Sequence, residues 1–386
     1  DNAGAAGATL ANNIRTGCGY GGAFYMLDKA TGEIWKVDDK GQEVFRKIDV
    51  KDADGNGLGL ALTSDDAGNL IGIRVTGGFF ANAPLKFIVI PADATAAVTE
   101  FEIPAITGYT NERTDVLGRV AGDVLSEDGG IIYMCSNNST AIASYIISAS
   151  GVEPSEFASS AIPAIGTGGL NTAVPMYNNF EDQMAADPIY DGCYFMPWSD
   201  VAYGFADEEV YKIARPEGMI FSAVPGGDVI NREEGVYIVS NYTATKDKRD
   251  GNFCIYKEDG AELVWKSDFS ALTTAYGAFM NGGSLSVRQT GENTYDIYSF
   301  SGGNTAGAIV SYYTIEFPAA PAPQYPEQLY LIGGANDFTE PIEANAEALK
   351  AWTLTQTEPG IYEGTFNIPV TKSNFRFYSA LTGWDG

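Results

Sequence analysis

Short apolar runs rich in Tyr, Phe, Val, Ile and Thr alternate along the chain with turns rich in Gly, Asp and Asn. Runs of about four to eight such residues bounded by turn residues are typical of β-strands. A 3.6-residue period is sustained nowhere, and the best helical segment is the short stretch Glu340–Ala351. The pattern therefore predicts an all-β protein.

Pairs of these apolar runs recur as hairpins. The hairpins expected to be innermost in each repeat cover residues 60–75, 121–136, 184–199, 226–241 and 283–300, and the outer hairpins cover 33–48, 85–103, 143–157 and 252–269. Four strands in about 40–60 residues is the period of a propeller blade. The repeat predicts a β-propeller, and its irregular spacing leaves an array of β-sandwiches as the alternative.

The segment Ala23–Ile48 supplies one more blade, whose innermost strand is not evident. That strand comes either from Ile14–Gly19 or from the end of the array as a closing clasp. We therefore predict about six blades, with five or seven also compatible, over residues 18–317. Residues 1–17 are expected to be an N-terminal extension.

The composition changes after Phe317, where Pro318–Pro326 reads PAAPAPQYP. Such a run favours extended polyproline geometry and acts as a semi-rigid linker. Residues 327–386 then carry the strand-like runs LYLIGG, AWTLTQ, GIYEGTFNI and NFRFYSA. We expect this segment to be a partial β-sandwich module, truncated within its fold.

The segments EQLYLIGGANDF, GIYEGTFNI and NFRFYSALTGWDG resemble modules of SusE- and SusF-like proteins. These are surface-exposed outer-membrane lipoproteins that bind glycans in Bacteroidetes polysaccharide-utilisation systems. The resemblance covers about 60 of the 386 residues. It implies carbohydrate binding, a cell-surface location and outer-membrane protein partners. The lipobox cysteine of that family is not present, because the sequence begins with Asp1.

The charge balance excludes some classes of function. The chain has a formal net charge of −27 and contains no histidine. Phosphate backbones repel such a chain, so nucleic acid is not an expected partner. A catalytic triad with histidine and a His-ligated metal are excluded as well. We expect no cofactor and assign no metal ligands.

A calcium-binding loop is the one metal alternative. Residues 52–57, DADGNG, match the first positions of an EF-hand loop, but Thr63 stands where a bidentate Glu is needed. A solvated turn between blades is the preferred interpretation. The four cysteines have no CxxC spacing, so buried free thiols are expected, with one disulfide as the alternative.

Three aspartates stand at the same place in the alignment of the first strands: Asp123, Asp187 and Asp228. First strands line the central channel of a propeller, so a carboxylate rim there suits a cation, a sugar or acid–base catalysis. The alternative is that each Asp accepts backbone hydrogen bonds at a strand connection. The small residues before each Asp favour this structural role.

Aromatic side chains are the second set of candidates, because a sugar ring stacks on Trp or Tyr. Trp384 and Asp385 lie in the Gly-flanked loop GWDG, where we expect Trp384 to be a platform and Asp385 a hydrogen-bond acceptor. Trp352 and Trp198 are further candidates, with core packing as their alternative. Trp35 and Trp265 lie in outer hairpins and are expected to pack between blades.

The sequence favours a non-enzymatic, cell-surface glycan-binding protein for a neutral polysaccharide or oligosaccharide. No catalytic residue is assigned. A propeller-type glycoside hydrolase or lyase is the first alternative, which needs two carboxylates with one raised pKa. A protein–protein interaction scaffold is the second. Fold alone does not decide among them.

Overall fold

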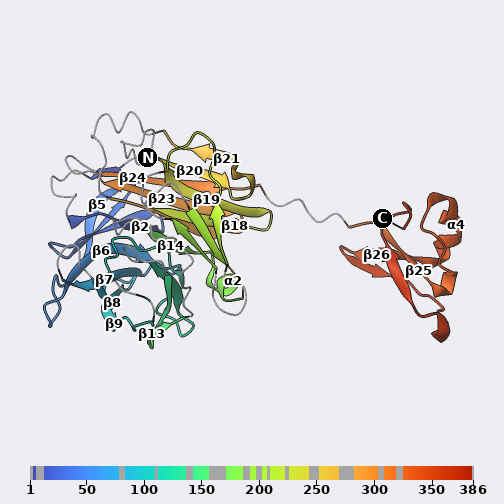
Figure 1. Ribbon diagram of the computed structural model, residues 1–386, viewed down its shortest axis with the longest axis horizontal. Coiled ribbons are helices and arrows are strands. Elements are labelled where there is room, and N and C mark those ends of the chain that lie inside the picture. Colours follow the sequence, from blue (N-terminus) through green and yellow to red (C-terminus); the bar gives the residue numbers. More distant parts are fainter. Residues whose placement is uncertain are drawn as a thin grey trace. The chain divides into compact units, whose positions relative to one another are not determined.

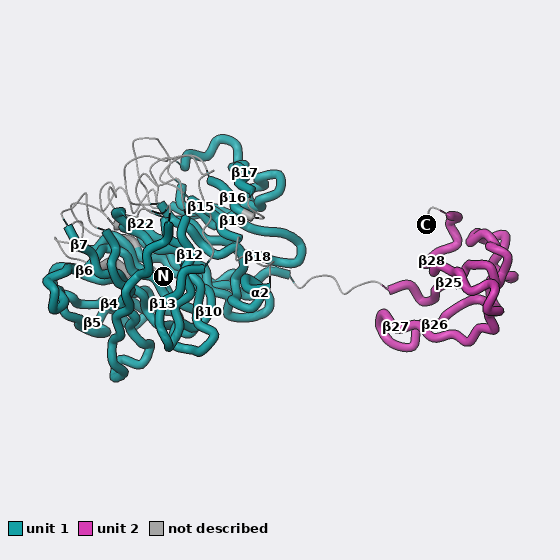
Figure 2. Tube along the Cα trace, turned by 60° about the horizontal axis from the view of Figure 1, so that its bottom comes forward, with its two compact units in different colours: residues 1–318 teal, residues 319–386 magenta. Residues whose placement is uncertain are grey.

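The chain forms two compact units, Asp1–Pro318 and Ala319–Gly386 (Figure 2). A computed structural model describes most of both units. The described residues are 3–5, 13–77, 83–107, 109, 112–135, 142–155, 171–185, 192–196, 202–206, 209–221, 226–242, 252–268, 282–302, 308–318 and 325–384.

Unit 1 contains six four-stranded antiparallel sheets among its described residues (Figure 1). Blades 1 and 2 consist of β2 (Gly17–Tyr20), β3 (Ala23–Asp28), β4 (Glu33–Asp38), β5 (Gly41–Lys47), then β6 (Gly57–Ser64), β7 (Leu70–Thr76), β8 (Ala83–Ile90) and β9 (Thr99–Glu102). Blades 3 and 4 consist of β10 (Ala121–Gly122), β11 (Gly130–Cys135), β12 (Ile142–Ser148), β13 (Gly151–Pro154), then β14 (Thr172–Pro175), β15 (Cys193–Met196), β16 (Ala202–Ala206) and β17 (Glu209–Ile213). Blade 5 consists of β18 (Gly227–Arg232), β19 (Gly235–Tyr242), β20 (Asn252–Lys257) and β21 (Leu263–Lys266), and blade 6 of β22 (Gly282–Gly291), β23 (Thr294–Gly302), β24 (Ala308–Glu316) and β1 (Ala3–Ala5).

The six sheets form a closed ring, because an apolar cluster of described residues fills each seam between neighbouring blades. Residue pairs that share a cluster across each seam are Cys18 and Leu62, Phe87 and Tyr145, Ile131 and Phe195, Tyr194 and Tyr256, Val239 and Val287, and Phe24 and Phe300. The first and last blades lie side by side (Figure 1), with β2 contacting both β22 and β23. The six-bladed β-propeller predicted from the repeat is therefore confirmed.

Ring closure uses two strands from the start of the chain, of which the sequence suggested one. β2 is the innermost strand of blade 1, so that strand comes from the Ile14–Gly19 region. β1 pairs with β24 as the outermost strand of blade 6, with Gly4 opposite Ile309. The expectation of an N-terminal extension over residues 1–17 is therefore wrong, because two strands begin within it. The clasp comes from the N-terminus because the edge of β24 needs a hydrogen-bonding partner.

Blade 4 also differs from the sequence expectation. The hairpin predicted over residues 184–199 does not form, because its first part is helix α2 (Phe180–Ala185) and the innermost strand is β14. Asn179 accepts the Asp182 amide at 2.7 Å at the start of this helix. Gln183 is fully buried and donates to the Tyr133 hydroxyl at 2.9 Å. Long-range contacts of α2 thus override the local strand-like composition.

Unit 2 is one four-stranded antiparallel sheet in the order β27-β26-β25-β28. Its strands are β25 (Gln328–Gly333), β26 (Thr353–Glu358), β27 (Ile361–Glu363) and β28 (Phe375–Tyr378). The helical stretch expected at Glu340–Ala351 forms as η3 (Glu343–Asn345), α4 (Ala346–Leu349) and η4 (Lys350–Trp352). Its Leu349 is fully buried against Tyr330 and Ile332. Residues 319–324 of the Pro-rich linker lie outside the described residues.

Candidate functional site

The carboxylate of Asp228 is committed to the interior of the propeller. It is fully buried and pairs with the equally buried Arg119 guanidinium at 3.2 Å. Asp228 also accepts the Val287 amide at 2.7 Å. Arg119 donates onward to the carbonyls of Pro175 and Tyr177 at 3.2 and 2.9 Å. One buried ion pair thus joins blades 3, 5 and 6 to the end of β14.

A second arginine connects blade 6 with blades 2 and 3. Arg288 of β22 donates to the Asp66 carboxylate at 2.9 Å and to the Val120 carbonyl at 3.1 Å. It also donates to the Ser64 hydroxyl at 2.8 Å. The guanidinium is buried. Since a buried charge is costly unless it is paired, these contacts indicate a structural role for the inner strands.

The predicted equivalence of the three aspartates is wrong. Asp123 directly follows β10 at the hairpin turn, whereas Asp228 is the second residue of β18. Asp187 lies outside the described residues. The true counterpart of Asp123 is Asp65, since both are the first residue of the turn that follows an innermost strand. The alignment failed because apolar runs give the positions of strands but not their register.

Asp65 and Asp123 fasten blades 2 and 3 together. Asp65 accepts the Asn69 side chain at 2.8 Å and the Val124 amide at 2.9 Å. The Asn69 amide group also donates to Asp123 at 3.0 Å. Burial raises the pKa of Asp65, which is the property a catalytic acid needs. Asp65 has no exposed surface, however, so substrate has no access to it.

The acidic loop at residues 52–57 is a hydrogen-bonded turn of the same design. Asp52 accepts the amides of Asp54 and Asn56 at 3.0 and 2.8 Å and the Asn56 side chain at 3.0 Å. The Lys86 ammonium lies 3.1 Å from the same carboxylate. These contacts, led by the Asn56 side chain, lower the pKa of Asp52. The Asp52 carboxylate is therefore already paired with a cation, the Lys86 ammonium.

Three of the described tryptophans pack against other apolar or aromatic side chains, and none of the three is fully buried. Trp352 ends η4 and stacks on Phe366, with ring centroids 5.8 Å apart and nearly parallel rings. Trp35 packs against the cluster between blades 6 and 1. Trp265 lies 5.1 Å from Phe253. Trp198 lies outside the described residues. Trp352 therefore packs on Phe366 and does not line the pocket that contains Trp384.

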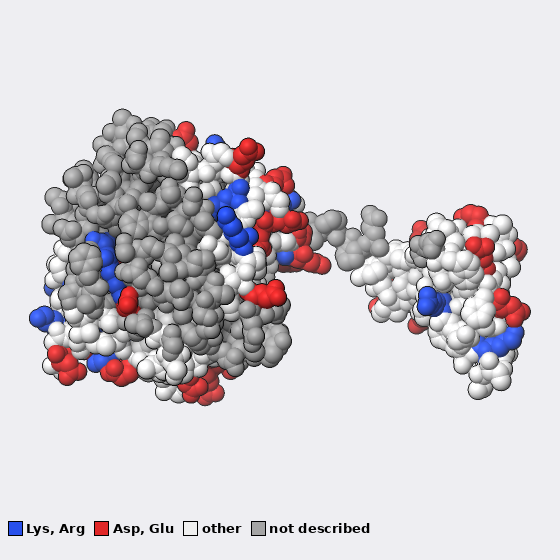
Figure 3. All heavy atoms as spheres, in the orientation of Figure 1, with Lys and Arg blue, Asp and Glu red and all other residues white. Residues whose placement is uncertain are grey.

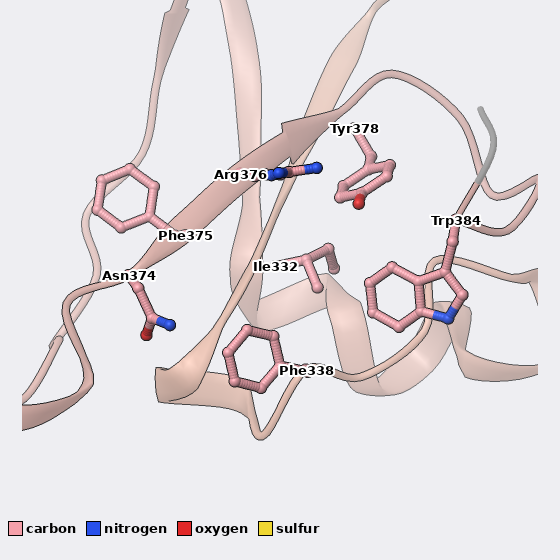
Figure 4. A pocket seen from close by; sticks show the side chains of 7 residues that line it. All are labelled: Ile332, Phe338, Asn374, Phe375, Arg376, Tyr378 and Trp384. Atoms are coloured by element: carbon pink, nitrogen blue, oxygen red, sulfur yellow. The ribbon is translucent and has the colours of Figure 1, made fainter.

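Trp384 lines a pocket of about 390 Å³ in unit 2. The ring is 47% exposed, and Phe338 across the pocket is 53% exposed. Tyr378 meets Trp384 edge to face, with ring centroids 5.9 Å apart. Figure 4 shows these three rings around the Ile332 side chain, with Arg376 beside Tyr378. Asn374 and Phe375 complete the lining.

Local backbone geometry fixes the positions of Phe338 and Asn374 at the pocket. Phe338 follows Asp337, and both have φ of +53°, which bulky residues adopt only under tertiary constraint. The Phe338 amide donates to the Gly333 carbonyl at 2.9 Å and fixes this turn. A Cβ on Gly333 would lie 2.2 Å from the Asn374 carbonyl. The glycine of the LIGG motif thus lets the chain at Asn374 pass close to β25.

The sequence identified one residue of this pocket and missed the rest. Trp384 was found because a Gly-flanked loop rarely buries a large aromatic. Asp385, its predicted partner, lies outside the described residues. Phe338, Tyr378 and Arg376 were missed, because two lie in a strand-like run that reads as core. The alternation of FRFY holds the signal, since Arg376 and Tyr378 share one face of β28.

The four cysteines are buried thiols outside any disulfide, as predicted. Burial raises the pKa of Cys18, Cys135 and Cys254 to about 12, so these thiols are protonated at neutral pH.

On the face in Figure 3, acidic and basic side chains of the described residues lie in small groups without a continuous basic surface. Among the described residues, no group of three or more acidic or cysteine side chains is arranged to hold a metal ion. No described helix has the length and apolar character needed to cross a membrane.

No protein-family model and no curated protein matches this sequence. Many solved structures are similar to it, among them the following three. A triple arginine variant of AofleA from Arthrobotrys oligospora is 9% identical, covering 80% of this chain and 88% of its own, with a TM-score of 0.44. The SapL1 lectin in complex with α-methyl fucoside is 9% identical, covering 82% and 99%, with a TM-score of 0.42. An auxiliary nutrient binding protein from Bacteroides thetaiotaomicron is 8% identical, covering 75% and 66%, with a TM-score of 0.39. At these identities, function has to be argued from the residues of this chain.

Proposed function

We propose that the protein is a non-enzymatic glycan-binding protein and that unit 2 contacts a neutral saccharide through the Trp384 pocket. The observation that carries this proposal is the pair of half-exposed rings, Trp384 and Phe338, beside Tyr378. Large aromatic groups left in water on both sides of a pocket favour a ligand with apolar faces. The pocket volume falls in the range of about 300–1,000 Å³ that small-molecule sites occupy.

A pyranose suits this lining better than a purely apolar ligand does. Its C–H face stacks on an aromatic ring, while its hydroxyl groups need hydrogen-bond partners around the edge. Arg376 supplies guanidinium donors, and the Asn374 amide both donates and accepts. The net charge of −27 repels polyanions, so a neutral glucan, mannan or xylan is proposed rather than a uronate polymer.

The cell-surface setting is a finer part of the same proposal. Its support is the resemblance of the segments around LYLIGG, GIYEGTF and FRFY to SusE- and SusF-like modules. On that basis we propose a surface-exposed outer-membrane lipoprotein of a polysaccharide-utilisation system, with outer-membrane protein partners. Fractionation of the native host, followed by immunodetection and protease accessibility of intact cells, tests this location.

The binding proposal is tested by affinity gel electrophoresis of the full chain in amylose, mannan, xylan and polygalacturonate. We expect retardation by at least one neutral polymer and none by polygalacturonate. Trp384→Ala is expected to weaken binding by about tenfold or more, which corresponds to about 1.4 kcal/mol. Tyr325→Ala is the matched control, since Tyr325 is a 45% exposed aromatic residue of unit 2 that does not line the pocket.

Three outcomes would contradict this assignment. If Trp384→Ala is retarded as strongly as the wild type, the pocket is not the binding site. Loss of retardation in Tyr325→Ala alone moves binding to a part of unit 2 outside the pocket. A melting temperature lowered by several degrees in Trp384→Ala shows that the ring is packing rather than binding.

A further inference from the structure

We propose that the propeller carries a second saccharide site at the seam between blades 6 and 1, a proposal that deepens the glycan-binding function above. A pocket of about 800 Å³ opens there. Its walls come from the β2–β3 and β4–β5 turns of blade 1 and from strands β23 and β24 of blade 6. Nothing in the sequence pattern pointed to this place, because its two walls are separated by most of unit 1.

One wall of the seam pocket is an exposed aromatic platform. Tyr312 is 40% exposed and stacks on the buried Tyr298 with ring centroids 5.0 Å apart. The two tyrosines are direct cross-strand partners on β23 and β24. Tyr312 thus offers a flat ring whose orientation is set by a buried neighbour, which lowers the ordering cost of binding.

Tyr298 is itself held firmly in place. Its hydroxyl accepts the Gly22 amide at 2.9 Å. A Cβ on Gly19 would lie 1.7 Å from the Tyr298 ring, so only glycine allows this close approach between blades 1 and 6. Below the tyrosines, Phe24 stacks on Phe300 with ring centroids 5.6 Å apart. The platform is therefore preorganised by the same contacts that close the ring.

The opposite wall is polar and balanced in charge. Lys36 lies 3.2 Å from Asp38, and both line the pocket together with Asp39 and Lys40. The Lys36 ammonium donates hydrogen bonds to Asp38 and Glu43, and these bonds, with Asp38 contributing most, raise the pKa of Lys36, so its ammonium stays charged. Two cations and two carboxylates leave no net charge in the lining. Such a lining favours neither an anion nor a cation.

These features together select the chemistry of the ligand. An exposed ring face, an apolar floor and paired donors and acceptors of zero net charge match a neutral sugar, whose faces are apolar and whose hydroxyls donate and accept. A phosphate ester would face Asp38 and Asp39, and an organic cation would face Lys36 and Lys40. We therefore assign the same neutral saccharide class to this site as to unit 2.

Stoichiometry in calorimetric titration tests the second site. The probes are maltotetraose, mannotetraose and xylotetraose, each titrated into the full chain. We expect two molecules bound per wild-type chain, one in Tyr312→Ala, one in Trp384→Ala and none in the double variant. Tyr312→Phe should retain two, because it keeps the ring. Tyr211→Ala is the matched control, since Tyr211 is also 40% exposed but lies on β17 outside the pocket.

Each failure points to one proposal. One molecule per wild-type chain that Trp384→Ala abolishes and Tyr312→Ala leaves unchanged overturns the seam site and keeps the unit 2 site. One molecule that Tyr312→Ala abolishes and Trp384→Ala leaves unchanged does the reverse. Binding of none of the three probes overturns both sites. If Tyr312→Ala does not fold, Lys36→Met replaces it, with the same expected loss of one site.

Discussion

The charged groups of the propeller interior and the aromatic rings of unit 2 differ in their exposure to solvent. In the propeller, charged groups such as Arg119, Asp228 and Arg288 are buried and paired across blades. In unit 2, aromatic rings stand in solvent, with Phe338 and Trp384 about half exposed. Residue type alone therefore does not identify the candidate binding groups in either unit.

This difference helps to decide whether a carboxylate or an aromatic ring has a structural role or is available to bind a ligand. A carboxylate in a propeller channel satisfies buried amides and guanidinium groups before any substrate arrives, because each unpaired buried polar group costs free energy. An exposed aromatic ring beside a pocket does not have to satisfy buried polar groups. A buried and fully paired carboxylate is therefore a structural group, whereas an exposed ring that lines a pocket is a candidate for ligand binding.

The largest expected effect breaks the buried pair of the propeller. Asp228→Ala leaves Arg119 buried without its carboxylate, which typically costs about 3–5 kcal/mol. Urea denaturation at pH 7 measures the free energy of unfolding. The double variant Arg119→Met with Asp228→Leu should recover part of the loss, because no unpaired charge remains. A loss below about 1 kcal/mol would show that the pair is not essential to the ring.

A second prediction concerns the strand that closes the ring. Deletion of residues 1–5 removes β1 and exposes the edge of β24. We expect a loss of about 1–3 kcal/mol, since each net hydrogen bond contributes about 0.5–1.5 kcal/mol. Hydrogen exchange should accelerate at β24 amides and stay unchanged at β28 in unit 2. Unchanged protection at β24 would contradict the clasp.

The two kinds of aromatic residue are compared directly in a third prediction. Phe24→Ala removes a ring that is 1% exposed and should cost about 3–5 kcal/mol. Trp384→Ala removes a half-exposed ring and should cost less than about 1 kcal/mol. Thermal unfolding of both variants against wild type measures the contrast. Similar losses in both would mean that Trp384 is a core residue.

The smallest effect belongs to the loop at Asp52. Its pKa is lowered in the folded protein, so its contribution to stability is present above the unfolded pKa of about 3.9 and is lost as the pH falls through the folded pKa. The difference in melting temperature between wild type and Asp52→Asn should be largest at pH 7 and shrink towards pH 3. Asp54→Asn is the control, since the Asp54 side chain is 77% exposed. A difference in melting temperature that grows as the pH falls would contradict this prediction.

Local sequence signals predicted much of the fold. The period of apolar runs located most strands of the six blades, and the change after Phe317 lies next to the division between the units. The same signals indicated that the cysteines are buried and that Trp384 stands outside a regular strand. These properties follow from the composition and alternation of neighbouring residues, which is information that a short segment contains.

Only the tertiary structure decided how segments far apart combine. It paired β1 with β24, made β14 rather than residues 184–187 the inner strand of blade 4, and set Asp123 and Asp228 at different heights. It also placed Tyr312 and Lys36 in the lining of one pocket, and Phe338 and Trp384 in the lining of another. Register and pocket geometry depend on partners distant in the sequence, and a period of apolar residues fits several registers equally well until those partners pack.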